Sequence, residues 1–217
     1  MIAPMFELPP ERLSLSGGIY IWRFPLESAD DSVLSRDEVA RAESYRSEQA
    51  RATFVAGRSG VRRAGAVYSG TPAPDLLIAS EGKPAFSNAP VCFNLSHTAS
   101  TVIAAFSGAP VGIDLEACGR VRDFARLAAR FFHPDEARAV AAAGDEGFFL
   151  QLWTAKEAML KLTGEGIADG LADARPGMGG SGTLRGRAVH LLRFAFDDKI
   201  GALASFEPIE VKGWFQI

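Results

Sequence analysis

Apolar residues recur along the chain with two periodicities: alternation, which is typical of strands, and a repeat of about 3.6 residues, which is typical of helices. Up to residue 115, the pattern predicts strands at 18–26, 91–95, 101–106 and 111–115 and helices at about 35–47 and 48–68. Beyond it, the pattern predicts helices at 122–132, 134–143 and 145–163 and strands at 187–196, 200–206 and 209–215. The glycine-rich stretch 172–186 is predicted to be a flexible loop or a hairpin tip. The predicted helices and strands therefore fall into two comparable groups along the chain.

Local signals refine this outline. Ser35 is a predicted N-cap, because Glu38 follows three residues later and completes a capping box. Gly82, Lys83 and Pro84 form a predicted tight turn that places one lysine at its tip. The two groups meet near residues 107–110, so we expect two halves. Their predicted bounds are 1–108 and 109–217.

Composition narrows the class of protein. The chain has 217 residues, of which 47% are hydrophobic and 23% charged, as in globular proteins. It shows neither a signal peptide nor an apolar run long enough for a membrane span. Its two cysteines lack metal-site spacing and are interpreted as reduced core residues of a cytoplasmic protein.

Charge is unevenly distributed. The net charge of −3 argues against nucleic acid as the main partner. Residues 36–63, however, hold seven arginines against four acids. This segment predicts a basic patch for an anionic ligand or an acidic partner, although some of these arginines also fit a solvated helix face with Arg/Glu pairs.

Carboxylates recur at positions that suit a metal ion. Asp114 and Glu116 end an apolar strand and, being two residues apart, point to the same face. Buried paired acids need a cation, and Mg²⁺ prefers such oxygen ligands. On the helix 153–163, Trp153, Glu157 and Lys161 fall on one stripe opposite an apolar face. The alternatives are a solvated acidic turn and an ordinary amphipathic helix with a Glu/Lys pair.

The joint pattern of several motifs is more specific than any one of them. VGIDLE (111–116) followed by WTAKEAMLKLTGEG (153–166) resembles the paired signature of 4′-phosphopantetheinyl transferases, in the two-halved class that activates surfactin synthetase. GKP (82–84), FNLSH (93–97) and ARFFHPDE (129–136) resemble further motifs of that family. The resemblance covers roughly residues 50–170. It implies an α/β (α+β) fold, a monomeric pseudo-dimer of two similar halves, each a small sheet packed with helices, with the active site in the cleft between them.

The resemblance also implies roles for the acidic and basic residues of the catalytic centre. Asp114, Glu116 and Glu157 match the family's magnesium ligands, and Lys161 matches the lysine beside the pyrophosphate of coenzyme A. Asp114, Glu157 and Lys161 are therefore the expected catalytic residues. Either Glu157 or a water that it holds is the expected base. Lys156 matches a neighbouring cofactor-binding position, whereas Trp153 is expected to be structural.

A second set of residues is implied to bind coenzyme A. Ser96 and His97 match the contact to its 3′-phosphate, and Lys83 matches a residue of the nucleotide pocket. Arg58 resembles an arginine that contacts the same cofactor in some family members, with Arg51 as the alternative.

The implied reaction moves 4′-phosphopantetheine from coenzyme A to a serine of an acyl, peptidyl or aryl carrier protein and releases 3′,5′-ADP. Four arginines near the third predicted helix, together with Phe124 and Leu127, are the expected contact surface for such an acidic partner: Arg120, Arg122, Arg126 and Arg130. The alternatives are another magnesium-dependent phosphoryl-transfer enzyme and a non-enzymatic module that binds carrier proteins.

Overall fold

The computed structural model describes residues 1–15, 17–70, 76–78, 84–87, 91–164 and 170–217. By the contacts between its residues, the chain divides into two compact units. We call residues 5–109 with 210–217 the N-terminal unit, and residues 1–4 with 110–209 the C-terminal unit. The division at residues 108 and 109 into two functional halves, with a cofactor site between them, stays a prediction.

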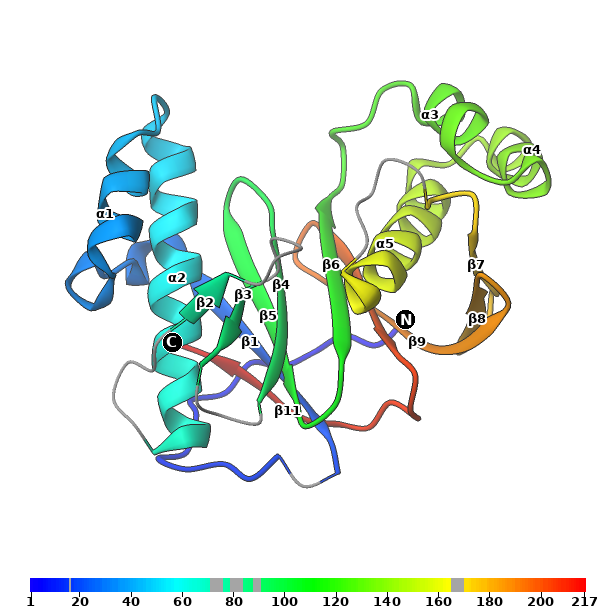
Figure 1. Ribbon diagram of the computed structural model, residues 1–217. Coiled ribbons are helices and arrows are strands. Elements are labelled where there is room, and N and C mark those ends of the chain that lie inside the picture. Colours follow the sequence, from blue (N-terminus) through cyan, green and yellow to red (C-terminus); the bar gives the residue numbers. More distant parts are fainter. Residues whose placement is uncertain (16, 71–75, 79–83, 88–90, 165–169) are drawn as a thin grey trace. The chain divides into compact units, whose positions relative to one another are not determined.

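The N-terminal unit is built on a four-stranded sheet with the order β11-β1-β5-β4. Its strands are β1 (Ile19–Pro25), β4 (Cys92–His97), β5 (Thr101–Ser107) and β11 (Val211–Gln216), with the separate pair β2 (Leu76–Ile78) and β3 (Pro84–Phe86). Its helices are α1 (Arg36–Glu43) and α2 (Glu48–Ser69), with the short 3-10 turns η1 (Leu26–Ser28) and η2 (Asp31–Val33). Figure 1 shows α2 lying along this sheet with α1 beside it.

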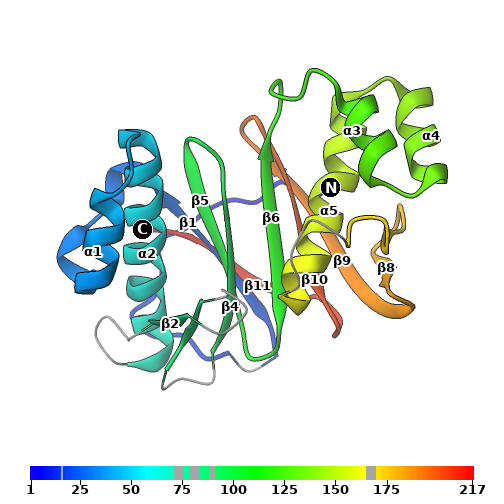
Figure 2. The same cartoon turned by 45° about the horizontal axis from the view of Figure 1, so that its top comes forward.

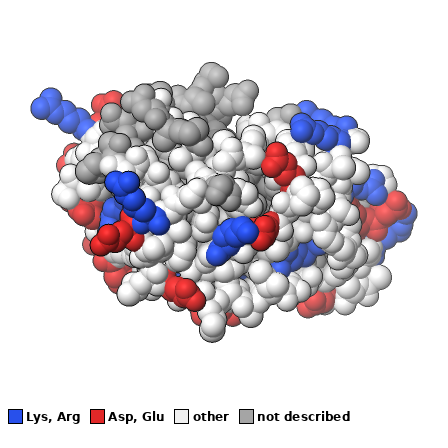
Figure 3. All heavy atoms as spheres, turned by 90° about the horizontal axis from the view of Figure 1, so that it is seen from below, with Lys and Arg blue, Asp and Glu red and all other residues white. Residues whose placement is uncertain are grey.

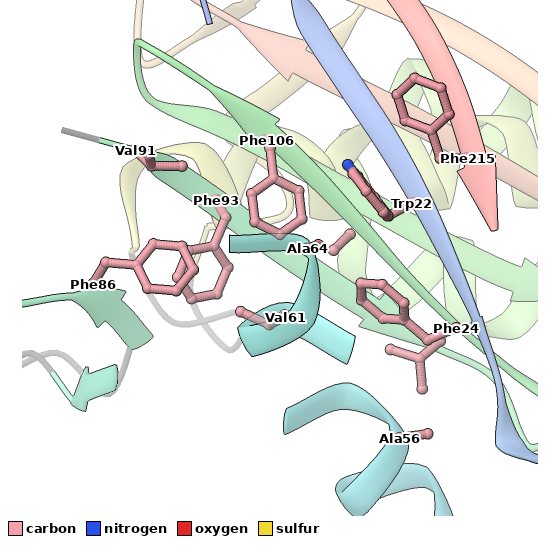
Figure 4. Close-up of a cluster of buried hydrophobic side chains, with 12 residues drawn as sticks. Trp22, Phe24, Ala56, Val61, Ala64, Phe86, Val91, Phe93, Phe106 and Phe215 are labelled. Atoms are coloured by element: carbon pink, nitrogen blue, oxygen red, sulfur yellow. The ribbon is translucent and has the colours of Figure 1, made fainter. Parts of the chain in front are cut away.

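An aromatic core holds α2 against the sheet. Trp22 and Phe24 of β1 and Phe106 of β5 have no exposed surface, and they face Val61 and Ala64 of α2 (Figure 4). Each of these large side chains stabilises the fold by about 1.5–3 kcal/mol through burial. The apolar spacing on α2 therefore determines which of its faces meets the sheet.

The C-terminal unit is built on a five-stranded sheet with the order β6-β10-β9-β8-β7. Its strands are β6 (Val111–Ala117), β7 (Ala174–Pro176), β8 (Ser181–Leu184), β9 (Arg187–Phe196) and β10 (Lys199–Ser205). Its helices are α3 (Phe124–Phe131), α4 (Pro134–Ala143) and α5 (Glu146–Thr163). In Figure 2, α5 lies against β6 and β10, and α3 and α4 lie side by side.

One glycine allows α5 to approach β6 closely. A Cβ atom built on Gly112 would lie 1.9 Å from the carbonyl oxygen of Ala158 and 2.7 Å from the amide nitrogen of Leu162. No side chain fits at that distance, so the backbones of the two elements are in direct contact. This contact sits two residues before Asp114 on β6 and one residue after Glu157 on α5.

The mixed α/β class is confirmed, and the three helices between residues 122 and 163 lie close to their predicted bounds. The capping box of Ser35 and Glu38 is also confirmed. The first helix ends at Glu43, before its expected end near Ser47, because Ser47 instead caps α2 by accepting a hydrogen bond from the Ala50 amide. β2 and β3 were not predicted, and the glycine-rich stretch forms the hairpin β7–β8.

Two further expectations concern membrane-spanning segments and the cysteines. Within the described ranges, every helix is too short or too polar to cross a bilayer. Cys92 and Cys118 are both free thiols and are half-buried, so they lie at the edge of the core.

Candidate active site

Two carboxylates of β6 and two polar side chains of α5 meet in the C-terminal unit. Lys161 Nζ lies 2.6 Å from Asp114 Oδ1 and 4.0 Å from Glu157 Oε2. Asp114 is almost completely buried at 2% exposure, whereas Lys161 keeps 22% of its side chain exposed. The lysine thus connects the strand and the helix, with its ammonium group partly open to water.

Local sequence explains why α5 presents these residues here. Asp145 accepts hydrogen bonds from the amides of Gly147 and Phe148 and begins the helix. Gly164 ends it with a left-handed conformation, φ 81°, which glycine adopts without strain. Between these caps, Glu157 and Lys161 stand one turn apart, so both reach the same side of β6.

Burial makes the carboxylates hard to ionise together. Burial and, after it, the charge of Asp114 raise the pKa of Glu116 to about 7, against the opposing effect of Lys161. The pKa of Glu157 also rises to about 7, through burial first and then Asp114, with Glu116 adding to the rise. A hydrogen bond from the Trp153 side chain partly offsets both shifts. Three carboxylates therefore interact with one ammonium group, and the cluster has an excess of negative charge.

This donor set suits a hard divalent cation, since three carboxylates offer the oxygen ligands that Mg²⁺ prefers. The described residues, however, contain no group of three acidic, histidine or cysteine side chains arranged to hold a metal ion. Lys161 makes the close contact with Asp114 instead. The residue chemistry fits the cation, and the assignment of its three ligands stays a prediction.

The ammonium group of Lys156 contacts oxygens of the protein, whereas the resemblance implies a position that binds the cofactor. Its side chain has no exposed surface, and Nζ lies 2.7 Å from Glu136 Oε2 and donates to the carbonyl oxygens of Leu171 and Ala174. Nζ also lies 4.8 Å from the ring centroid of Phe132. Protein oxygens thus use all three donor hydrogens of the ammonium group. The sequence pattern did not show this pairing, because Glu136 is twenty residues away on α4.

The second set of residues expected to bind coenzyme A (Arg58, Ser96 and His97) lies in the N-terminal unit, and Lys83 is outside the described residues. Ser96 and His97 end β4, where Ser96 is buried and His97 is exposed. The side chain of Gln49, in the first turn of α2, donates a hydrogen bond to the carbonyl of Ala99, which lies in the turn between β4 and β5. The end of the β4–β5 hairpin is therefore attached to the start of α2.

The two candidate arginines of α2 differ in their partners. Arg51 is exposed and lies 3.4 Å from Asp31. Arg58 is 16% exposed, lies 3.7 Å from Glu38 Oε1 and stacks over Phe54. Within the described part of the chain, its buried Nη1 has no hydrogen-bond acceptor. A buried guanidinium nitrogen without an acceptor favours an anionic ligand at Arg58 rather than Arg51.

Glu38 was predicted only as a helix cap, and the structure gives it a second role. One carboxylate accepts hydrogen bonds from the Ser35 amide and from Arg62 Nη2, at 2.9 and 2.6 Å. The same carboxylate faces Arg58. The sequence did carry a signal for this shared contact with Glu38. Arg58 and Arg62 are four residues apart, which places both on one side of α2.

Arginine side chains are exposed on and just before α3: Arg120, Arg122, Arg126 and Arg130. Phe124 and Leu127 pack inward, and the Phe124 ring lies 6.1 Å from that of Phe149. On the face drawn in Figure 3, basic and acidic side chains are interspersed. The arginines of α3 and of the residues just before it thus form a local basic cluster of the C-terminal unit.

Comparison with known proteins agrees with the motifs and the fold. Residues 110–196, which include Asp114, Glu157 and Lys161, match the model of the 4′-phosphopantetheinyl transferase superfamily. The chain is 35% identical over 176 residues to the 4′-phosphopantetheinyl transferase HetI of Nostoc sp., and the match covers 74% of each protein.

Further relatives share shorter regions. The chain is 41% identical to the 4′-phosphopantetheinyl transferase psf-1 of Bacillus pumilus over 52% of each protein. It is 36% identical to the 4′-phosphopantetheinyl transferase Sfp of Bacillus subtilis over 40% of each. The mixed α/β fold, the acidic centre and these relatives are all consistent with one class of enzymes, the phosphopantetheinyl transferases. The chain belongs to the 4′-phosphopantetheinyl transferase superfamily, as the resemblance predicted.

Proposed function

We propose that this protein transfers the 4′-phosphopantetheine group of coenzyme A to a serine hydroxyl of an acyl, peptidyl or aryl carrier protein and releases 3′,5′-ADP. The observation that supports this most is the grouping of Asp114, Glu116, Glu157 and Lys161 inside the region that matches the family. The proposal includes a dependence on Mg²⁺ and action as a monomer in the cytoplasm.

In the transfer step, the serine oxygen forms a bond to the phosphorus that bears pantetheine, and the bond from that phosphorus to the ADP oxygen breaks. Mg²⁺ held by Asp114, Glu116 and Glu157 would supply Lewis-acid stabilisation of the phosphate oxygens. The ammonium group of Lys161, on the same side of β6, would stabilise the charge that develops on those oxygens.

The serine must also lose its proton. Glu157 is the candidate acceptor, because its carboxylate stands beside Lys161 in the same cluster, with Oε2 4.0 Å from Lys161 Nζ. Its side chain is buried at 7% exposure on the inner side of α5. The proton therefore goes to Glu157 directly or through a water molecule that Glu157 orients.

The N-terminal unit would bind the nucleotide end of coenzyme A. Arg58 offers a buried donor nitrogen, and His97 with Ser96 stands at the exposed end of β4. Both features suit the 3′-phosphate. Lys83 is the expected further cation of this pocket.

For the carrier protein, the exposed arginines of α3 are the proposed contact surface. The double variant Arg122→Glu and Arg126→Glu should raise the KM for the carrier protein and leave coenzyme A affinity unchanged. Arg138→Glu, an exposed arginine of α4 that pairs with Asp135, is the matched control. An unchanged KM in the double variant would remove α3 from the proposal.

The activity is tested by intact-mass spectrometry of an apo carrier protein incubated with the chain, coenzyme A and Mg²⁺. Transfer adds about 340 Da to the carrier protein, as a phosphoserine ester. EDTA and Asp114→Asn should each abolish the gain, whereas Glu207→Gln, an exposed acid of the same unit, should not. If fatty-acid, polyketide and peptide carriers all keep their mass, the proposed reaction is wrong.

A further inference from the structure

A stripe of three residues on α2 supports the β4–β5 hairpin. Gln49, Thr53 and Gly57 stand at i, i+4 and i+8, so they share one side of the helix. Gln49 Nε2 donates to the Ala99 carbonyl. A Cβ on Gly57 would lie 3.6 Å from Val102 Cγ1, so β5 passes directly over this glycine. Thr53, between them, is buried.

The hairpin transmits these contacts to the end of β4. Val102 is the register partner of His97. The turn between them is closed by a hydrogen bond of 2.9 Å from the Thr98 amide to the Thr101 carbonyl. A second bond of 3.3 Å runs from the Ser100 amide to Thr98 Oγ1. The turn is therefore a short, internally bonded unit, and a tether at Ala99 fixes a point two residues from His97.

Of the three α2 residues that lie against the hairpin, Gln49 is the exposed one. The side chains of Gln49, Ala99 and Ser100 are all exposed, so the tether contributes little buried area to the fold. His97 is exposed as well, at the end of β4 and two residues before Ala99. Loss of this hydrogen bond should therefore alter the hairpin tip more than it alters overall stability.

We propose that Gln49 is a positioning residue that holds the Ser96–His97 end of β4 for the 3′-phosphate of coenzyme A. This inference rests on the proposed function, in which His97 meets that phosphate. Gln49 itself acts only through the Ala99 carbonyl. It therefore determines how strongly the protein distinguishes coenzyme A from dephospho-coenzyme A, which lacks the 3′-phosphate.

The test is calorimetric titration of the purified chain with coenzyme A and with dephospho-coenzyme A. Gln49→Met keeps the length of the side chain and removes its donor. We expect it to weaken coenzyme A binding about 3–10-fold, the loss of one net hydrogen bond, and to leave dephospho-coenzyme A binding unchanged. In transfer assays, the KM for coenzyme A should rise while kcat at saturation stays near the parent value.

Two controls separate positioning from a general structural effect. Glu48→Gln alters the neighbouring exposed residue of the same helical turn and should leave both affinities unchanged. In a His97→Ala background, Gln49→Met should have no further effect on coenzyme A binding, since the two residues act through one contact.

Equal loss of affinity for both ligands in Gln49→Met would overturn the inference, and so would unchanged affinity for coenzyme A. An additive effect in the His97→Ala background would overturn it too. Failure of the chain to modify any carrier protein would instead contradict the proposed function, because the ratio of the two binding constants is measured without transfer.

Discussion

The ammonium nitrogen of Lys161 lies 2.6 Å from Oδ1 of Asp114 and thereby links α5 to β6. Asp114 is nearly sealed from water, so this lysine is a close cation for a carboxylate that is costly to bury alone. A divalent ion that binds Asp114 must share its oxygens with the lysine. Under the proposed function, we therefore expect Lys161 to affect both the transfer step and the affinity for metal.

Lys161→Met should separate these two effects. The variant removes a positive charge from the phosphate oxygens and should lower kcat by about 10²–10³-fold. It should also tighten the binding of Mn²⁺, used as a spectroscopic substitute for Mg²⁺, because one competing cation is gone. Electron paramagnetic resonance titration without coenzyme A measures the second effect. Weaker Mn²⁺ binding in the variant would contradict this account of the pair.

Gly112 and Gly57 should respond in opposite ways to substitution by alanine. Gly112→Ala places a methyl group against the Ala158 carbonyl and should cost several kcal/mol, about 3 or more, by pushing α5 from β6. Gly57→Ala meets only an ordinary contact with Val102 and should stabilise α2 by about 0.5–1 kcal/mol. Urea unfolding measures both. Equal effects would mean that the close approach of α5 and β6 is not maintained in solution.

Lys156→Met should reveal whether the buried lysine is structural. The change leaves Glu136 without its closest cation and removes the hydrogen bonds that Lys156 donates to two carbonyl oxygens, so we expect a loss of about 2–4 kcal/mol in the free energy of unfolding. Arg175, 3.5 Å from Glu136, limits that loss. Lys212→Met, an exposed lysine paired with Glu210, is the control and should change stability by less than about 0.5 kcal/mol.

Binding measurements on folded Lys156→Met complete that test. An unchanged dissociation constant for coenzyme A is expected from the contacts of the ammonium group with protein oxygens. A large loss of coenzyme A affinity, with stability preserved, would support the cofactor-binding role that the sequence motif implies.

Much of this arrangement follows from the sequence and some of it does not. Periodicity located α5 and β6 and placed Glu157 and Lys161 on one stripe, because those relations are local. The partners of Lys156 lie on α4, just before β7 and at the first residue of β7, and the partner of Arg58 lies on α1, so both sets depend on how the elements pack. β2 and β3 escaped prediction because three residues are too few to show a period.

The environment of Glu38 predicts a pH dependence of stability that is independent of Asp114, Glu116 and Glu157. Burial opposes its ionisation, yet hydrogen bonds from the Ser35 amide and Arg62, with the charges of Arg62 and Arg58, hold its pKa below the ordinary value of 4.5. A depressed pKa means that the unfolded chain takes up the proton first. The stabilisation is therefore present above pH 4.5 and is lost as pH falls through the folded pKa.

Glu38→Gln keeps an acceptor for the capping box and removes the charge. Near pH 7 the variant should be less stable than the parent by about 1–3 kcal/mol. The difference should shrink as pH falls below 4.5, because the parent then loses the same charge. Urea unfolding at several pH values gives the comparison. A constant difference across that range would show that the carboxylate charge does not stabilise the contact between α1 and α2.

The parallel pairing of β11 with β1 joins residues 211–216 to a sheet whose other strands all lie before residue 108. Phe215 of β11 packs its ring 5.2 Å from that of Trp22. During synthesis, residues 110–209 leave the ribosome before β11 does. Until then, the edge of β1 that pairs with β11 has no partner strand from β11. A nascent chain stalled before residue 210 would keep that edge exposed, and an exposed edge invites pairing with other chains. Completion of the sheet of the N-terminal unit is thus a late event in the synthesis of the chain.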